Sequence, residues 1–277
     1  MPSHPKRLSE FAPMQSLPTR LPEPPPMEAS ISAAGFTTVL AVEARKLRCS
    51  LALLLAVVAP LLIAVFVFFN LVRQAKPMPW AMTLQFSSAI WAFFMLPMSA
   101  TALTALIAHT EHGPRAWDYL RALPMPRWHL HAAKSICMLG VVTLMSAALA
   151  TLVPVAVLAA GLVKPSVAAT GTPDFAAYLM VLARIQLSAF LLVAVQLWIA
   201  LRHSSFVPAL AAGIGGTFFA VVATSAKIGV VMPWQIPVNQ LASDPARAQL
   251  ALVVGFAGGC LLFVAMCWRM GRREVLA

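Results

Sequence analysis

The sequence predicts an all-α integral membrane protein with six transmembrane helices. Of its 277 residues, 60% are hydrophobic and only 10% are charged, and the mean hydropathy is +0.83. Soluble domains are typically about 45–50% apolar and about 25% charged, so this chain lacks the polar surface of a water-soluble protein. The apolar residues lie in continuous runs without the alternation of barrel strands, which excludes a transmembrane β-barrel.

The beginning of the chain differs from the rest. Residues 1–27 hold eight of the 22 prolines and almost no aromatic or β-branched residues, so we expect a disordered proline-rich extension. This stretch has no apolar segment of about 7–15 residues, and a cleaved export signal is therefore not expected. Translation from Met1 and from Met27 both agree with this boundary. Residues 28–277 are expected to form one six-helix transmembrane domain.

Residues 31–50 have the pattern of an amphipathic helix. Phe36, Val39 and Leu47 lie toward one side, and a basic cluster that includes Arg45 and Lys46 closes the segment. Such a helix is expected to lie in the membrane interface and to lead into the first span. The alternative is a simple extension of that span.

Six apolar runs reach the length of about 20 residues that a helix needs to cross the hydrocarbon layer. They are residues 51–72, 84–108, 135–162, 177–201, 205–224 and 249–268.

The distribution of basic residues predicts that both termini are cytoplasmic. In that orientation the inner side holds about twice as many basic residues as the outer side. The inner residues are Arg45, Lys46, Arg48, Arg115, Arg121, Arg127, Lys134, Arg202, Arg269, Arg272 and Arg273, and the outer ones are Arg73, Lys76, Lys164, Lys227 and Arg247. The net charge of +11 therefore suits anionic lipid headgroups, and no nucleic-acid partner is expected because no basic-aromatic motif accompanies it.

Arg184 is a charge inside the fourth apolar run. At about 1.5 Å per residue it lies about 27 Å from Arg202, near the outer boundary. We expect its side chain to extend outward to the membrane surface rather than to relay charge for a substrate.

The longest polar interruption, residues 109–134, predicts a short helix in a loop. Proline fits the first helical turn and ends a helix, so Pro114 and Pro124 bound a helical piece at residues 115–123. Trp117, Leu120 and Leu123 share one face of it. A helix of two to three turns is not stable alone in water, so a partner is expected to dock against it.

This loop and the interfacial helix together resemble a known family. The loop resembles the coupling-helix loop of bacterial ABC-2 type transporter permeases, in which a glutamate, a Trp/Leu helix, Leu-Pro-x-x-Arg and a lysine follow one another. The corresponding residues here are Glu111, Trp117, Leu120, Leu123, Pro124, Arg127 and Lys134. The family also has an interfacial helix with an E-x-x-K-L-like signature, and residues 42–48, which contain Glu43, Arg45, Lys46 and Leu47, look like it.

The resemblance covers roughly residues 31–277, including the polar segment 232–237 before the last span. It is nearest to the small single-domain permeases of lantibiotic-immunity and multidrug exporters, and residues 1–27 depart from the pattern.

The resemblance implies a permease subunit of an ATP-driven exporter in the bacterial cytoplasmic (inner) membrane. A separate cytoplasmic ABC ATPase subunit would hydrolyse ATP with Mg²⁺, and a second permease copy or a related permease would complete a homo- or heterodimer. The ATPase-coupling residues would be Trp117 and Leu120 as apolar anchors, with Arg115, Arg121 and Arg127 around them.

The sequence agrees with ATP hydrolysis on a separate subunit, because no G-x-x-x-x-G-K-[ST] motif occurs in it. This chain is therefore expected to bind no cofactor and to be no enzyme. An amphipathic or apolar cargo is expected, such as an antimicrobial peptide, a drug or a lipid-like molecule, and the substrate-binding residues stay unknown.

Other functional classes have less support. An ion-gradient-driven secondary transporter predicts carboxylates within the spans, and none is present there. A non-catalytic subunit of a membrane assembly is the other alternative. The loop histidines, His109, His112, His129 and His131, are expected to be interfacial polar groups, and no metal site is expected. Polar residues in the spans, including Thr101, Gln186 and Gln196, and the glycines of the last span are expected to serve mainly helix packing.

Overall fold

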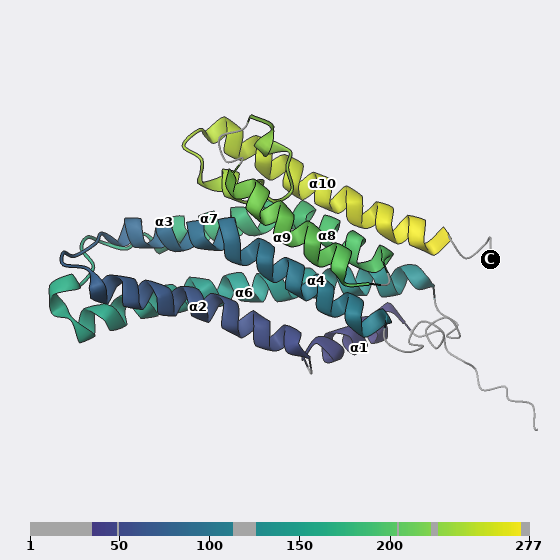
Figure 1. Cartoon of the computed structure of the whole chain (residues 1–277), viewed down its shortest axis with the longest axis horizontal. Helices are drawn as coiled ribbons and strands as arrows, with labels where there is room; N and C mark the ends of the chain where they lie inside the picture. Colours follow the sequence, from purple (N-terminus) through teal and green to yellow (C-terminus); the bar gives the residue numbers. More distant parts are fainter. Residues whose placement is uncertain (1–34, 49, 113–125, 204, 223–226, 273–277) are drawn as a thin grey trace, which may run out of the picture. The chain divides into compact units, whose positions relative to one another are not determined.

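The computed structural model of the chain is a bundle of long apolar helices (Figure 1). It describes residues 35–48, 50–112, 126–203, 205–222 and 227–272. The proline-rich extension predicted for residues 1–27 lies outside this part.

The interfacial helix and the first span follow each other directly. Helix α1 (Phe36–Arg48) ends in basic residues. Helix α2 (Leu51–Arg73) is capped at its N-terminus by Ser50, whose hydroxyl accepts a hydrogen bond from the Ala52 N–H. Because this cap satisfies one of the free N–H groups at a helix start, it fixes where the span begins. Among the described residues, five helical segments are long and apolar enough to cross a membrane: Leu51–Arg73, Trp80–Ile107, Trp128–Val163, Phe175–Arg202 and Pro245–Arg269.

The second span contains a widened turn. It consists of α3 (Trp80–Ile90), the π-helical segment η1 (Trp91–Met95) and α4 (Leu96–His112), and the Leu96 N–H bonds the carbonyl of Trp91, five residues earlier. Pro97 explains the widening, because a proline ring clashes with the carbonyl four residues before it, here that of Phe93. Single-turn π-bulges of this kind are frequent at functional sites.

The third span is one continuous helix that is longer than a bilayer. Helix α6 (Arg127–Val163) has 37 residues and is therefore about 55 Å long, against about 30 Å of hydrocarbon. Residues 127–134, which belong to the polar interruption in the sequence, thus run into the span without a break. Helix α2 packs along α6, and α1 packs on α6 as well.

The fourth span is broken at Ala189 into α7 (Phe175–Ser188) and α8 (Phe190–Arg202). The last helix, α10 (Pro245–Arg272), packs closely on it. At Gly255 a Cβ atom would collide with the backbone oxygen of Ser188, and at Gly259 with the backbone of Phe190. These glycines therefore let α10 approach the break, which agrees with the packing role predicted for them.

The fifth predicted span is short. Helix α9 (Val207–Val222) has 16 residues, or about 24 Å, and packs against α4 and α8. The chain returns to α10 through two 3₁₀ pieces, η3 (Lys227–Val230) and η4 (Val238–Leu241). The fold is therefore the predicted all-α membrane bundle with its interfacial helix, five long spans and one shorter apolar helix.

Polar residues within the spans join neighbouring helices. The Gln196 amide of α8 and the Thr101 hydroxyl of α4 lie 2.9 Å apart. Gln186 of α7 donates to the Thr143 hydroxyl of α6 at 3.1 Å and accepts from Ser146 at 3.0 Å. Hydrogen bonds between membrane helices hold a bundle together where no hydrophobic driving force acts between them.

The contact of α10 with the broken fourth span gives a test of this packing. We expect Gly255→Ala and Gly259→Ala each to destabilise the protein by about 1–3 kcal/mol, because backbone atoms cannot move aside for the new methyl group. Gly258→Ala is the matched control, since its Cβ would meet only a side-chain methyl of Leu191 at 3.4 Å. The measurement is the melting temperature in detergent, and equal values for all three variants would contradict the close approach.

Candidate functional site

Helix α1 packs on the first turns of α6. Val39 is buried against Leu130 and Ala133, and the ring of Phe36 stacks on Trp128 with centroids 6.2 Å apart. The apolar side predicted for α1 therefore packs, at the N-terminal end of α1, on the first turns of α6. The two segments are far apart in the sequence, and this contact brings the beginning of the first span to the beginning of the third.

A buried ion pair fixes the same contact. The carboxylate of Glu43 accepts a hydrogen bond from Lys134 at Oε2 and one from Lys46 at Oε1, both at 2.7 Å. The side chains of Glu43 and Lys134 are 8% and 2% exposed, whereas that of Lys46 is 45% exposed. We call the group Glu43, Lys46 and Lys134 the α1–α6 junction.

The charge of Glu43 is maintained by its partners. Burial alone raises the pKa of this carboxyl, but the charge of Lys134 and the hydrogen bonds from both lysines outweigh burial and hold the pKa below its ordinary value of 4.5. Glu43 is therefore ionised at neutral pH. A buried ion pair is expensive to desolvate, so removing either partner while the other stays charged is strongly destabilising.

The structure places all four residues predicted for the signature of the interfacial helix. Glu43 and Lys46 meet in it, Leu47 packs against the main apolar core, and Arg45 is exposed. The sequence did not predict the pairing of Glu43 with Lys134, 91 residues away. The available signal was a lone acid among the basic residues of α1 and a lysine just inside the third span.

The predicted ATPase-coupling residues mostly lie outside the described part of the chain. Helix α4 ends at His112 and α6 begins at Arg127. The side chains of Glu111 and Arg127, at these helix ends, are not described. The residues that lie outside are Arg115, Trp117, Leu120, Arg121, Leu123 and Pro124.

A second polar region lies at the N-terminal end of α10, in the segment that precedes this helix. In the segment 229–244 the Gln235 amide donates to the Ala220 carbonyl at 2.9 Å, which ties the segment back to α9. Asn239 donates to the Gly229 carbonyl at 2.9 Å, and Gln240 donates to the Ala248 carbonyl at 3.1 Å. All three residues are buried: Gln235 is 2% exposed, Asn239 6% and Gln240 8%. This segment includes the polar residues 232–237 singled out in the sequence.

Arg184 has protein partners in this region. Its Nε donates to Gln240 at 3.2 Å and its guanidinium contacts Gln249 at 3.4 Å. These partners lie in the segment 229–244 and in α10, and the sequence did not predict them. The predicted outward direction of the Arg184 side chain stays a prediction.

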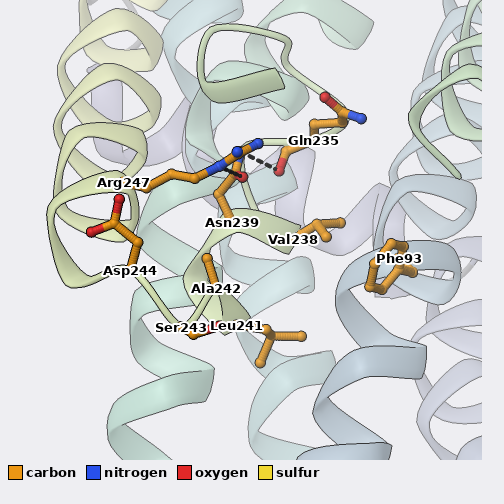
Figure 2. A pocket seen from close by; sticks show the side chains of 9 residues that line it. All are labelled: Phe93, Gln235, Val238, Asn239, Leu241, Ala242, Ser243, Asp244 and Arg247. Atoms are coloured by element: carbon orange, nitrogen blue, oxygen red, sulfur yellow. Dashed lines mark hydrogen bonds between the residues drawn. The ribbon is translucent and has the colours of Figure 1, made fainter. Parts of the chain in front are cut away.

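The segment 229–244 forms one wall of a cavity of about 340 Å³ (Figure 2). Arg247 of α10 and Asn239 meet on one side, with the Arg247 Nε donating to the Asn239 Oδ1 at 2.8 Å, and Phe93 of η1 lies across from them. The remaining lining residues are Gln235, Val238, Leu241, Ala242, Ser243 and Asp244. Sequence reasoning missed Asn239, Gln240 and Arg247, because only the fold brings them together.

Comparison with known proteins gives one match. A model of the family described as "ABC-2 family transporter protein" matches residues 39–223, which is more than half of the chain. No curated protein and no solved structure matches the chain.

The α1–α6 junction predicts a large effect of neutralising its buried members. Glu43→Gln or Lys134→Gln should each cost about 3–5 kcal/mol of stability, because each removes one member of a buried ion pair. Lys46→Gln, the matched control, should cost at most about 1 kcal/mol, because that lysine is half exposed. Melting in detergent measures all three, and the double variant Glu43→Gln with Lys134→Gln should cost less than the sum of its singles.

The lowered pKa of Glu43 also predicts a pH dependence. A carboxyl whose folded-state pKa is depressed contributes stability that is present above its ordinary value and is lost as the pH falls through the folded value. The difference in melting temperature between wild type and Glu43→Gln should therefore be constant at neutral pH and shrink below about pH 4.5. A difference that stays unchanged down to pH 3 would contradict the ionised pair.

Proposed function

The chain belongs to the ABC-2 family of transporter proteins, and we propose that it is the permease subunit of an ATP-driven exporter that works with a separate ATPase. In this proposal it resides in the cytoplasmic membrane with both termini on the cytoplasmic side. Its cargo is amphipathic or apolar. It acts as a homodimer or beside a related permease.

The observation that carries this proposal is the α1–α6 junction, which holds the first turns of α6, the helix that follows residues 113–125 in the sequence. A subunit that pushes on this loop would act on the base of α6, and α1 is fastened to that base by the Glu43–Lys134 pair. Because packed elements with a rigid connection move together, the first and third spans would respond as one body. This is the arrangement that a membrane subunit needs if another subunit supplies the energy.

The absence of a phosphate-binding loop from the sequence supports hydrolysis on a partner. Binding of ATP phosphates by a P-loop requires a glycine-rich turn followed by Lys and Ser or Thr, and the glycines at 213, 215 and 216 lie within helix α9 with no lysine after them. ATP and Mg²⁺ would therefore be held by the ATPase subunit.

The proposed partnership predicts the outcome of a pull-down. Tagged full-length chain, extracted from its own membranes in mild detergent, should recover a P-loop ATPase identified by mass spectrometry. The double variant Trp117→Ala with Leu120→Ala should recover at least about tenfold less, because apolar anchors of this kind dominate binding energy. Phe69→Ala with Leu162→Ala is the matched control, since both side chains are exposed and belong to the opposite end of their spans.

Retention of the ATPase by the double variant would place the coupling contact elsewhere. Recovery of no ATPase by folded wild-type protein would favour the alternatives, an ion-gradient-driven transporter or a non-catalytic subunit of a membrane assembly.

A further inference from the structure

A groove of about 270 Å³ lies where α1, α2 and α6 meet. Its lining is apolar except for Arg48, the last residue of α1. The residues of α2 and α6 that line it include Leu53, Ala56, Gly140 and Leu144. Because the apolar span of α2 begins only three residues after Arg48, the basic end of α1 stands at the membrane boundary. The groove extends from there along the first turns of the span.

Gly140 keeps the groove open. In the part of the chain that the structure describes, a Cβ atom at this position would meet nothing within 4 Å. The leucines that flank the opening, Leu53 and Leu144, are 43% and 55% exposed. An open glycine between exposed leucines provides a surface that a hydrocarbon chain can fill, because each close carbon contact adds dispersion attraction.

Positive charge at the end of the groove is not neutralised by the described residues. The side chains of Arg48 and of Arg45, its neighbour one turn earlier, are exposed and form no ion pair there. Glu43, the acid of α1, is held by the two lysines of the α1–α6 junction. The other acids whose side chains are described, Asp174 and Asp244, begin α7 and α10 at the opposite ends of the spans (Figure 1).

We propose that this groove binds one anionic phospholipid of the membrane. One acyl chain lies in the groove between α2 and α6, and the phosphate lies at Arg48, within reach of Arg45. The charge identifies the occupant, because basic residues directly beside a span attract anionic lipid headgroups. The apolar lining requires that the rest of the occupant is hydrocarbon. This site needs only that α2 crosses the membrane, and it is independent of the proposed transport.

The lipid adds a contact to the α1–α6 junction. It touches the end of α1, the start of α2 and the face of α6 at once, whereas the Glu43–Lys134 pair joins only α1 to α6. A ligand that binds only the folded arrangement stabilises it. The charge composition of the membrane would thereby influence how firmly the first span is held to the third.

The test is a lipid titration of the full-length chain in detergent, read by native mass spectrometry. The probe is phosphatidylglycerol, and phosphatidylcholine with the same two acyl chains reports on the charge of the head. The readout is the fraction of chains that carry one lipid. The melting temperature of every variant shows that it is folded.

For the head, we expect one saturable phosphatidylglycerol adduct and about fivefold or weaker binding of phosphatidylcholine. Arg48→Gln should weaken binding of phosphatidylglycerol about fivefold, because one cation at the membrane surface is lost. Arg73→Gln is the matched control, since it removes an exposed arginine at the other end of α2 and should leave this adduct unchanged.

For the tail, Gly140→Leu should weaken binding about tenfold, because the new side chain displaces two or three methylene groups of the acyl chain. Gly215→Leu is the matched control. It is also an exposed helical glycine whose Cβ would meet nothing within 4 Å, but it belongs to α9 and does not line the groove. Binding by this control should equal that of the wild type.

Equal binding of the two lipids, or of Arg48→Gln and Arg73→Gln, would overturn the head site. Undiminished binding by Gly140→Leu would overturn the tail site. If Gly140→Leu instead converted dimers to monomers without changing the lipid adduct, a second copy and not a lipid would occupy the groove. Should Arg48→Gln not fold, the lipid comparison and the two glycine variants still decide. Any of these negative results beside an intact ATPase pull-down rejects the lipid site and leaves the proposed function standing.

Discussion

The hydrocarbon layer contains no water, and this constraint decides where the chain places its polar groups. Long helices satisfy the backbone, so the remaining problem is the side chains. The hydroxyl and amide groups of the spans meet one another across helix contacts, as Thr101 and Gln196 do. In the segment 229–244 the backbone is irregular. Amide side chains of this segment donate hydrogen bonds to the backbone carbonyls of Ala220, Gly229 and Ala248.

The two polar regions solve this problem in different ways. At the α1–α6 junction, charges of opposite sign neutralise each other and close the contact, so the region is suited to transmitting force. Near the cavity, arginine side chains are held by neutral amides, because Arg247 donates to Asn239 and Arg184 donates to Gln240. The same low-dielectric surroundings strengthen both effects, because interactions between charges are weakly screened there.

Much of the fold follows from local sequence, and most of the candidate site does not. The lengths of the apolar runs predict most ends of the spans to within about four residues, but the third span begins at Trp128, before the predicted 135. The pattern around Glu43 predicts the helix α1. The break at Ala189 and the shortness of α9 are less accessible, because continuous apolar composition conceals helix ends. The Glu43–Lys134 pair and the cavity depend on contacts between residues tens of positions apart, which no local pattern encodes. The widened turn at Trp91–Met95 is intermediate, because Pro97 predicts a disturbance but not its form.

The length of α6 has a mechanical consequence. A helix of 37 residues is stiff, and the interior proline, Pro154, lies in its last third, so the part before it transmits bending as a single rod. Helix α2 lies along this rod and would tilt with it. If the base of the rod is displaced sideways while its middle is held by the other helices of the bundle, the opposite end moves in the reverse direction. Narrowing at one face of the membrane and widening at the other are then two ends of one lever stroke and need no separate moving part.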